Sequence, residues 1–150
     1  MQTRGAIYHH KDMIFYNGGV SNKYLILLNT PNKNEPYLFV KTTSQKKFRP
    51  DNQECIKREK CFFIQAGTSF FPKPTWVLLH EIYPMGAADI DNNKDVKLLR
   101  DELIHDLIEK IVDCLFKVSG QDLSGKFKKL LRPSIVEGLL KLQDHFNQKK

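Results

Sequence analysis

The sequence has no long apolar run. Its longest apolar stretches, Tyr24 to Leu28 and Trp76 to Leu79, are far shorter than the ~20 residues that a membrane-spanning helix needs. We therefore expect no transmembrane segment and no membrane partner. A chain of 150 residues can bury one hydrophobic core, so it does not need disulfides or metals for stability.

Cysteine is scarce as well. There are three, Cys55, Cys61 and Cys114, and an odd number in a chain without a signal-like start favours a reducing, cytoplasmic location. The Cys55-x5-Cys61 spacing differs from the two-residue spacing of common zinc sites, so we expect no metal. Phosphate-binding glycine loops, dinucleotide fingerprints and nucleophile elbows are missing too, which argues against a cofactor.

Neither sign of charge is concentrated in one part of the chain. The formal net charge is +7, with an excess of four positive residues up to residue 92 and of three after it. A moderate positive charge attracts anionic partners, of which nucleic acid is the commonest, although lysines also serve solubility alone. Charge alone therefore does not choose between an RNA-binding protein and an ordinary basic surface.

What is present up to residue 92 is a series of short segments rich in β-branched and aromatic residues, separated by turn formers. Asn17-Gly18 is the sharpest hairpin signal among the turns. Spacings of about 8 to 12 residues predict antiparallel pairing into a small barrel or a strongly curled sheet. The predicted strands are Ala6 to Tyr8, Met13 to Tyr16, Lys23 to Leu28, Tyr37 to Thr42, Cys61 to Gln65 and Thr75 to Tyr83.

From residue 93 to 150 the apolar period changes to three and four residues, which predicts helices. The first would run from about Asn93 to Ser119, the second over Leu123 to Leu131, and the last over about Ser134 to Phe146. Isolated helices of this length are marginal in water, so they must pack on the β-rich part or on a partner. We expect an α+β protein, a 1–92 barrel followed by a 93–150 helical extension of two to three helices.

Several of these segments, in this order, resemble the MazF/PemK-type toxins over about residues 4 to 90. They are Arg4-Gly5-Ala6-Ile7-Tyr8, Lys23-Tyr24-Leu25-Ile26-Leu27-Leu28-Asn29, Tyr37-Leu38-Phe39-Val40-Lys41-Thr42-Thr43-Ser44 and Thr75-Trp76-Val77-Leu78-Leu79. The resemblance implies an SH3-like antiparallel barrel, commonly a homodimer held by an antitoxin. It also implies a metal-independent endoribonuclease that cuts single-stranded RNA.

The catalytic pair that the resemblance implies is an arginine followed by proline and a threonine at a strand end. Thr43 and Ser44 match the strand end, whereas Lys23-Tyr24 stands where Arg-Pro is expected. Lysine supplies a positive charge but lacks the bidentate fork of arginine. The hydroxyls of Thr43 and Ser44 either hydrogen-bond a phosphate oxygen or simply close the strand.

A metal-free ribonuclease also needs groups that move protons, and histidine is the side chain best matched to that work near neutral pH. His80 is the candidate that we select, from the late strand. His9 and His10 follow the first strand, and at most one of them can point into a given groove because adjacent strand residues face opposite sides.

Basic residues gather in the segment after the third strand, beside aromatic ones. Such a loop can follow a single RNA strand while aromatic rings stack on its bases, or it can be a solvated loop above core phenylalanines. The predicted nucleic-acid contacts are Lys41, Lys46, Lys47, Arg49, Lys57 and Arg58, and the neighbouring aromatics are Phe39, Phe48, Phe62 and Phe63.

Three functions thus remain open. The first is a MazF/PemK-like ribonuclease, the second a non-catalytic barrel that binds nucleic acid, and the third a protein-interaction module that uses the C-terminal helices. The lysine at position 23 favours the second over the first, and the strand order favours the first.

Overall fold

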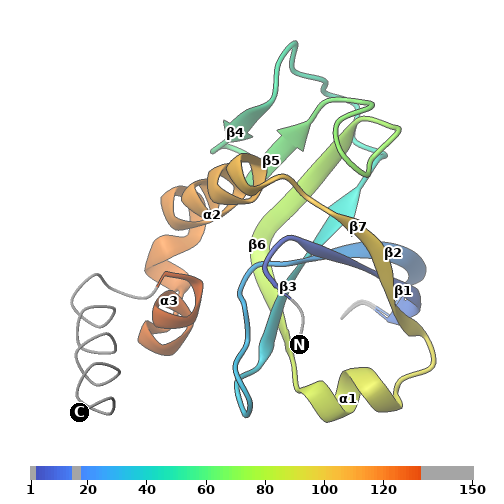
Figure 1. Cartoon of the computed structure of the whole chain (residues 1–150). Helices are drawn as coiled ribbons and strands as arrows, with labels where there is room; N and C mark the ends of the chain where they lie inside the picture. The colour runs from blue at the N-terminus through green and yellow to red at the C-terminus, as the bar shows by residue number, and fades with distance from the viewer. Residues whose placement is uncertain (1–2, 15–17, 133–150) are drawn as a thin grey trace.

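The computed structural model describes residues 3–14 and 18–132. They form an α+β fold with one seven-stranded sheet, in which every paired neighbour is antiparallel (Figure 1). The strands are β1 (Ala6–Ile14), β2 (Val20–Leu27), β3 (Tyr37–Thr43), β4 (Glu54–Ile56), β5 (Cys61–Ile64), β6 (Thr75–Met85) and β7 (Val96–Glu102). The predicted α+β class with an antiparallel sheet is confirmed.

The order of the strands across the sheet is β4-β5-β6-β3-β2-β1-β7. The predicted closure into a barrel is not confirmed: the sheet is open, because β4 and β7 stand at its two edges and are not paired with each other in the described part of the chain. The predicted strand from Met13 to Tyr16 is described only as far as Ile14, where it continues β1. Gly18 has φ +84°, the left-handed conformation for which the sequence supplies glycine at this hairpin.

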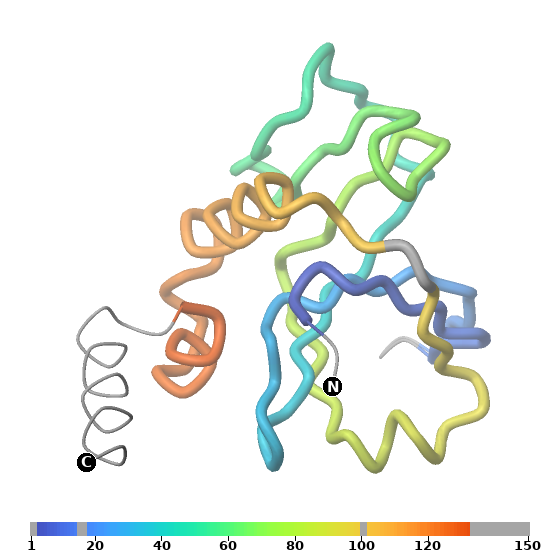
Figure 2. Tube along the Cα trace, viewed as in Figure 1, coloured from blue at the N-terminus to red at the C-terminus, as the bar shows by residue number. Residues whose placement is uncertain are grey.

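The prediction of one long helix from about residue 93 is wrong over its first half. Residues Val96–Glu102 form β7, which pairs with β1 through Val96 opposite His10 and Leu98 opposite Tyr8 (Figure 2). The outer edge of β1 offers unpaired N–H and C=O groups, and satisfying them outweighs a weak local helix preference. The apolar repeat that predicted one helix is made of side chains from two elements, β7 and the helix His105–Ser119.

The helix His105–Ser119 covers one face of the curved sheet at its β4–β6 end (Figure 1). Helix α2 (His105–Ser119) packs its apolar face on strand residues such as Ile7, Ile26 and Val77. The other helices are α1 (Ala87–Asn92), the short 3-10 turn η1 (Gly120–Asp122) and α3 (Gly125–Leu131). The predicted last helix, from about Ser134, lies outside the described residues. Thus α2 needs no partner chain to bury its apolar face.

The core has three parts. The largest lies between α2 and the sheet and includes Leu107, Ile111 and Leu115. A second cluster lies around Phe39 and also takes in Val96 of β7, and a third surrounds the fully buried Trp76. No helix in residues 3–14 and 18–132 is long and apolar enough to cross a membrane.

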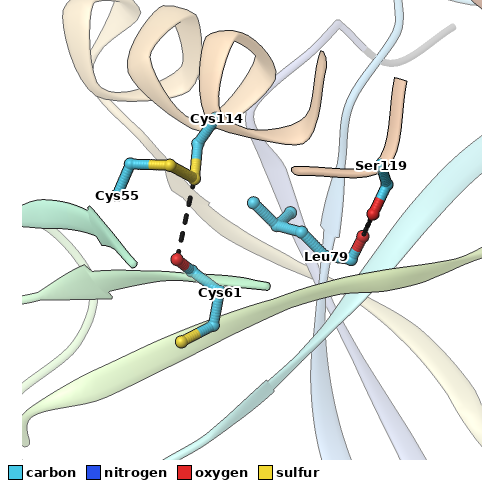
Figure 3. The surroundings of a disulfide bond; sticks show 5 residues. All are labelled: Cys55, Cys61, Leu79, Cys114 and Ser119. Atoms are coloured by element: carbon cyan, nitrogen blue, oxygen red, sulfur yellow. Dashed lines mark hydrogen bonds between the residues drawn. A yellow bond between two sulfur atoms is a disulfide. The ribbon is translucent and has the colours of Figure 1, made fainter. Parts of the chain in front are cut away.

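A disulfide joins Cys55 of β4 to Cys114 of α2 (Figure 3). The Sγ atom of Cys114 lies 3.6 Å from the carbonyl oxygen of Cys61, and Cys61 itself is a buried free thiol. Two of the three cysteines are therefore paired, and the third is free. The pairing counts against the inference of a reducing compartment, where disulfides are rare. The count failed because sequence spacing cannot show that α2 crosses over β4.

Candidate nucleic-acid interface

The pairing of β2 with β3 brings the two ends of the predicted catalytic set together. Leu25 lies opposite Lys41 and Ile26 opposite Val40. The β2–β3 pairing ends at Leu25 and Lys41, and Lys23 and Thr43 lie just beyond it, where both border one pocket. The hydroxyl of Thr42 donates a 3.0 Å hydrogen bond to the carbonyl oxygen of Tyr24, which fixes the two strand ends to each other.

Lys23, Thr43 and Ser44 line one open pocket of about 470 Å³. Its opposite wall is the segment that precedes β6, with Phe70, Phe71 and Lys73. Lys23 is partly buried, whereas Ser44 and Lys73 are exposed at the rim. The pocket thus combines two lysines with hydroxyl groups that can donate hydrogen bonds, which is a donor set suited to an anion such as a phosphate.

Several aromatic residues pack against one another along the pocket. The ring of Tyr24 lies edge-on to Phe70, with centroids 5.3 Å apart, and to His9 at 5.4 Å. Phe71 is buried behind them. His9 is therefore a packing partner of Tyr24, while the ring nitrogen Nδ1 of His10 lies 3.1 Å from the carbonyl oxygen of Lys11.

Burial and one neighbouring positive charge lower the pKa of Lys23. Burial makes the largest contribution, and repulsion by the Lys41 ammonium adds to it. Burial also lowers the pKa of Lys41, although Glu81 opposes that shift. The Nζ atom of Lys41 lies 5.0 Å from the centre of the Tyr83 ring. A lysine with a lowered pKa holds its proton less firmly and can exchange it in a reaction.

Comparison with protein-family models and with curated proteins finds no match to this chain. The evidence for function therefore comes from the residues and their geometry.

His80 does not join the pocket. It lines a smaller hollow of about 200 Å³ between β6, α2 and the segment around α3. Burial, followed by the positive charge of Lys41, lowers the pKa of His80, so the imidazole is neutral at neutral pH. The structure therefore brings Lys23, Thr43 and Ser44 together in one pocket. His80, on β6, lines a different hollow.

The predicted basic contacts are spread over a wider surface. Lys46 forms an ion pair with Glu59 at 3.1 Å, and Lys47 and Arg49 are exposed. Lys57 and Arg58 line a hollow of about 440 Å³. This hollow adjoins the β4–β5 turn and is separate from the Lys23 pocket.

Most of the aromatics proposed for base stacking are in the core. Phe39, Phe62 and Phe63 are at most 3% exposed, because strands β3 and β5 direct them inward. Stacking on these three rings is therefore excluded. Phe48 is the exception, at 58% exposed, and it lines the same hollow as Lys57 and Arg58.

Sequence reasoning missed Tyr24, Phe70 and Lys73 as members of the site. Tyr24 was read only as a replacement for proline, and the other two lie in a loop whose course no periodic pattern reveals. The signal that could have found them is Phe70-Phe71-Pro72-Lys73, two aromatics and a lysine just before a strand. Within the described residues, no group of three or more His, Cys, Asp or Glu side chains is placed to hold a metal ion.

Proposed function

We propose that the chain is a MazF/PemK-like endoribonuclease that cuts single-stranded RNA without a metal ion. The observation that carries the proposal is the meeting of Lys23, Thr43 and Ser44, from two strands, in one pocket with Lys73. The pocket places two positive charges and several hydroxyls around a space that can hold a phosphate. The resemblance in strand order adds to this support.

In this mechanism the scissile phosphate lies between Lys23 and Lys73. The neutral form of Lys23 takes the proton of the ribose 2′-OH, whose oxygen attacks the phosphorus. The Lys73 ammonium gives a proton to the departing 5′-oxygen. Thr43 and Ser44 donate hydrogen bonds to the non-bridging oxygens, whose negative charge increases in the transition state. The products are a 2′,3′-cyclic phosphate and a 5′-OH.

The same proposal covers fold relatives, partners and location. The curved antiparallel sheet is the counterpart of an SH3-like barrel, and a homodimer and an antitoxin protein are the expected partners. A ribonuclease that acts on cellular RNA would work in the cytoplasm. The disulfide between Cys55 and Cys114 is uncommon for that compartment; Cys114 is buried, whereas Cys55 is partly exposed.

Incubation of the purified protein with single-stranded RNA in EDTA tests the reaction. The wild-type protein should release fragments ending in a 2′,3′-cyclic phosphate, and Lys23→Ala and Thr43→Ala should each lower the rate at least tenfold. Lys33→Ala is the matched control, because Lys33 is exposed in the loop at the opposite end of β2 and β3. Equal rates for the wild-type, Lys23→Ala and Thr43→Ala proteins would reject catalysis in this pocket.

A second candidate is a protein that binds single-stranded RNA without cutting it. The specific observation in its favour is that neither a histidine nor a carboxylate is among the residues that line the Lys23 pocket. It predicts salt-sensitive binding without fragments. Binding should weaken when Lys46, Lys47 and Arg49 are changed to glutamate, since each change replaces a positive charge that attracts the RNA phosphates with a negative one.

A further inference from the structure

Tyr24 is an exposed aromatic residue that belongs to none of the three core clusters. Its side chain is 42% exposed, and it also lines the Lys23 pocket. Two rings nevertheless hold it from the sides, His9 at 5.4 Å and Phe70 at 5.3 Å, both in edge-on geometry. The hydrogen bond from Thr42 to its carbonyl oxygen fixes its backbone as well. The ring is therefore exposed and preorganised at once.

The pocket has room for a ligand larger than a phosphate. A volume of about 470 Å³ falls in the range of about 300 to 1,000 Å³ that is usual for sites of drug-sized ligands. Lys23, Lys73 and the hydroxyls account for the anionic part of such a ligand. Tyr24 follows Lys23 on β2, so the two side chains leave opposite faces of the strand, and Tyr24 with Phe70 supplies an apolar wall on a different side of the pocket from Lys23.

We propose that Tyr24 stacks on the unpaired base of the nucleotide whose phosphate lies between Lys23 and Lys73. This inference rests on the proposed function and adds to it a residue that recognises the base. Stacking on a side chain requires a base that is free of its neighbours in a helix, so the pocket selects single-stranded RNA over duplex RNA. Lysines alone would bind the phosphates of both forms.

Binding of a short single-stranded RNA that carries one 2-aminopurine tests the inference. Stacking of this base on Tyr24 should change its fluorescence on binding to the wild-type protein. Tyr24→Leu should abolish the change and weaken binding roughly 5- to 160-fold, the range for loss of one base–aromatic stack. Tyr24→Phe keeps the ring face and is the matched control, expected to bind within about twofold of the wild-type protein.

An RNA with an abasic site at the same position separates stacking from a general loss of structure. Tyr24→Leu should weaken binding to the RNA that carries the base and leave binding to the abasic RNA unchanged. Equal weakening for both RNAs, or wild-type binding by Tyr24→Leu, would overturn the inference. The fluorescence of Trp76, which is fully buried, shows whether each variant is folded.

The outcomes also separate this inference from the proposed function. Binding of RNA through Tyr24 without cleavage would contradict the ribonuclease proposal and support the stacking role. Cleavage of RNA at the wild-type rate by Tyr24→Leu would support the ribonuclease proposal and contradict the stacking role. Failure of the wild-type protein to bind any of these RNAs would overturn both.

Discussion

At the scale of single residues, the proposed chemistry of the pocket depends on Lys23. A lysine there cannot grip a phosphate with two parallel hydrogen bonds as an arginine can. It can lose its proton, however, whereas an arginine keeps its proton in proteins. Burial and the charge of Lys41 favour that loss. A lysine at this position can thus transfer a proton in the proposed reaction, whereas an arginine would supply only a fixed charge.

The pH dependence of RNA cleavage tests this role. If neutral Lys23 takes the 2′-OH proton, the rate rises with pH along a limb below the ordinary lysine pKa of 10.5. Lys41→Gln removes a like charge, so the pKa of Lys23 rises and the limb moves to higher pH. The measurement is the rate at each pH after subtraction of protein-free hydrolysis.

Lys33→Gln provides the control for that profile, because it removes one positive charge at the far end of the hairpin and should leave the limb where it is. A limb that Lys41→Gln does not shift, or one that persists in Lys23→Ala, would contradict a proton-transfer role for Lys23.

Part of the site could be predicted from the sequence at this scale. Thr43 and Ser44 end an apolar strand, and strand ends place polar side chains at the rim of a sheet. Lys23 starts the neighbouring predicted strand and lies within β2. Antiparallel pairing of two consecutive strands brings the first part of one close to the end of the next, which was enough to join the three residues. Lys73 and Phe70 could not be found in this way, because a loop follows tertiary packing rather than a period.

At the scale of elements, the strands were easier to predict than the boundary between sheet and helix. Residues such as Val40 and Phe62 lie in short β-branched and aromatic runs, which fit a pleated sheet whatever its neighbours are. Val96 and Leu99 fit a helix and a strand equally well, and the open edge of β1 decided between them. That edge exists only after the sheet has formed, so no local pattern records it.

The disulfide is the feature that ties two distant elements together. It joins β4 to α2 across 59 residues, and α2 covers the main core. Removing it, by Cys55→Ser with Cys114→Ser, should lower the free energy of unfolding by about 2–4 kcal/mol, because the unfolded chain regains freedom. Urea denaturation with and without a dithiol reductant measures the loss, and the reductant should have no effect on the double variant.

Titration of thiols in the unfolded, unreduced protein checks the pairing itself. One reactive thiol per chain is expected, from Cys61. Three thiols in protein purified without reductant would show that Cys55 and Cys114 are not joined.

At the scale of the whole molecule, the β-rich and helical parts of the sequence depend on each other. Strand β7 extends the sheet beyond β1, and α2 supplies Leu107, Ile111 and Leu115 to the main core. A chain that ends at residue 94 loses these contacts. It should lack a cooperative unfolding transition in urea and the near-ultraviolet circular dichroism of a packed Trp76.

A chain that ends at residue 132 is the matched control, since it keeps β7, α2 and α3. It should unfold cooperatively. A cooperative transition of equal free energy for the chain that ends at residue 94 would mean that the sheet is stable without the helices.

The central claim is that single-stranded RNA binds with a phosphate between Lys23 and Lys73. The most direct measurement is fluorescence anisotropy of a labelled, 2′-O-methylated RNA, which is not cut, over a series of salt concentrations. The measurement is made at a pH below the rising limb of the cleavage profile, where Lys23 keeps its proton. For Lys23→Ala with Lys73→Ala, the slope of log K against log salt should then become less steep by about 1.4, because two phosphate contacts are lost at about 0.7 each. Lys33→Ala should keep the wild-type slope. A double variant with the affinity and slope of the wild-type protein would place the RNA elsewhere and contradict the account.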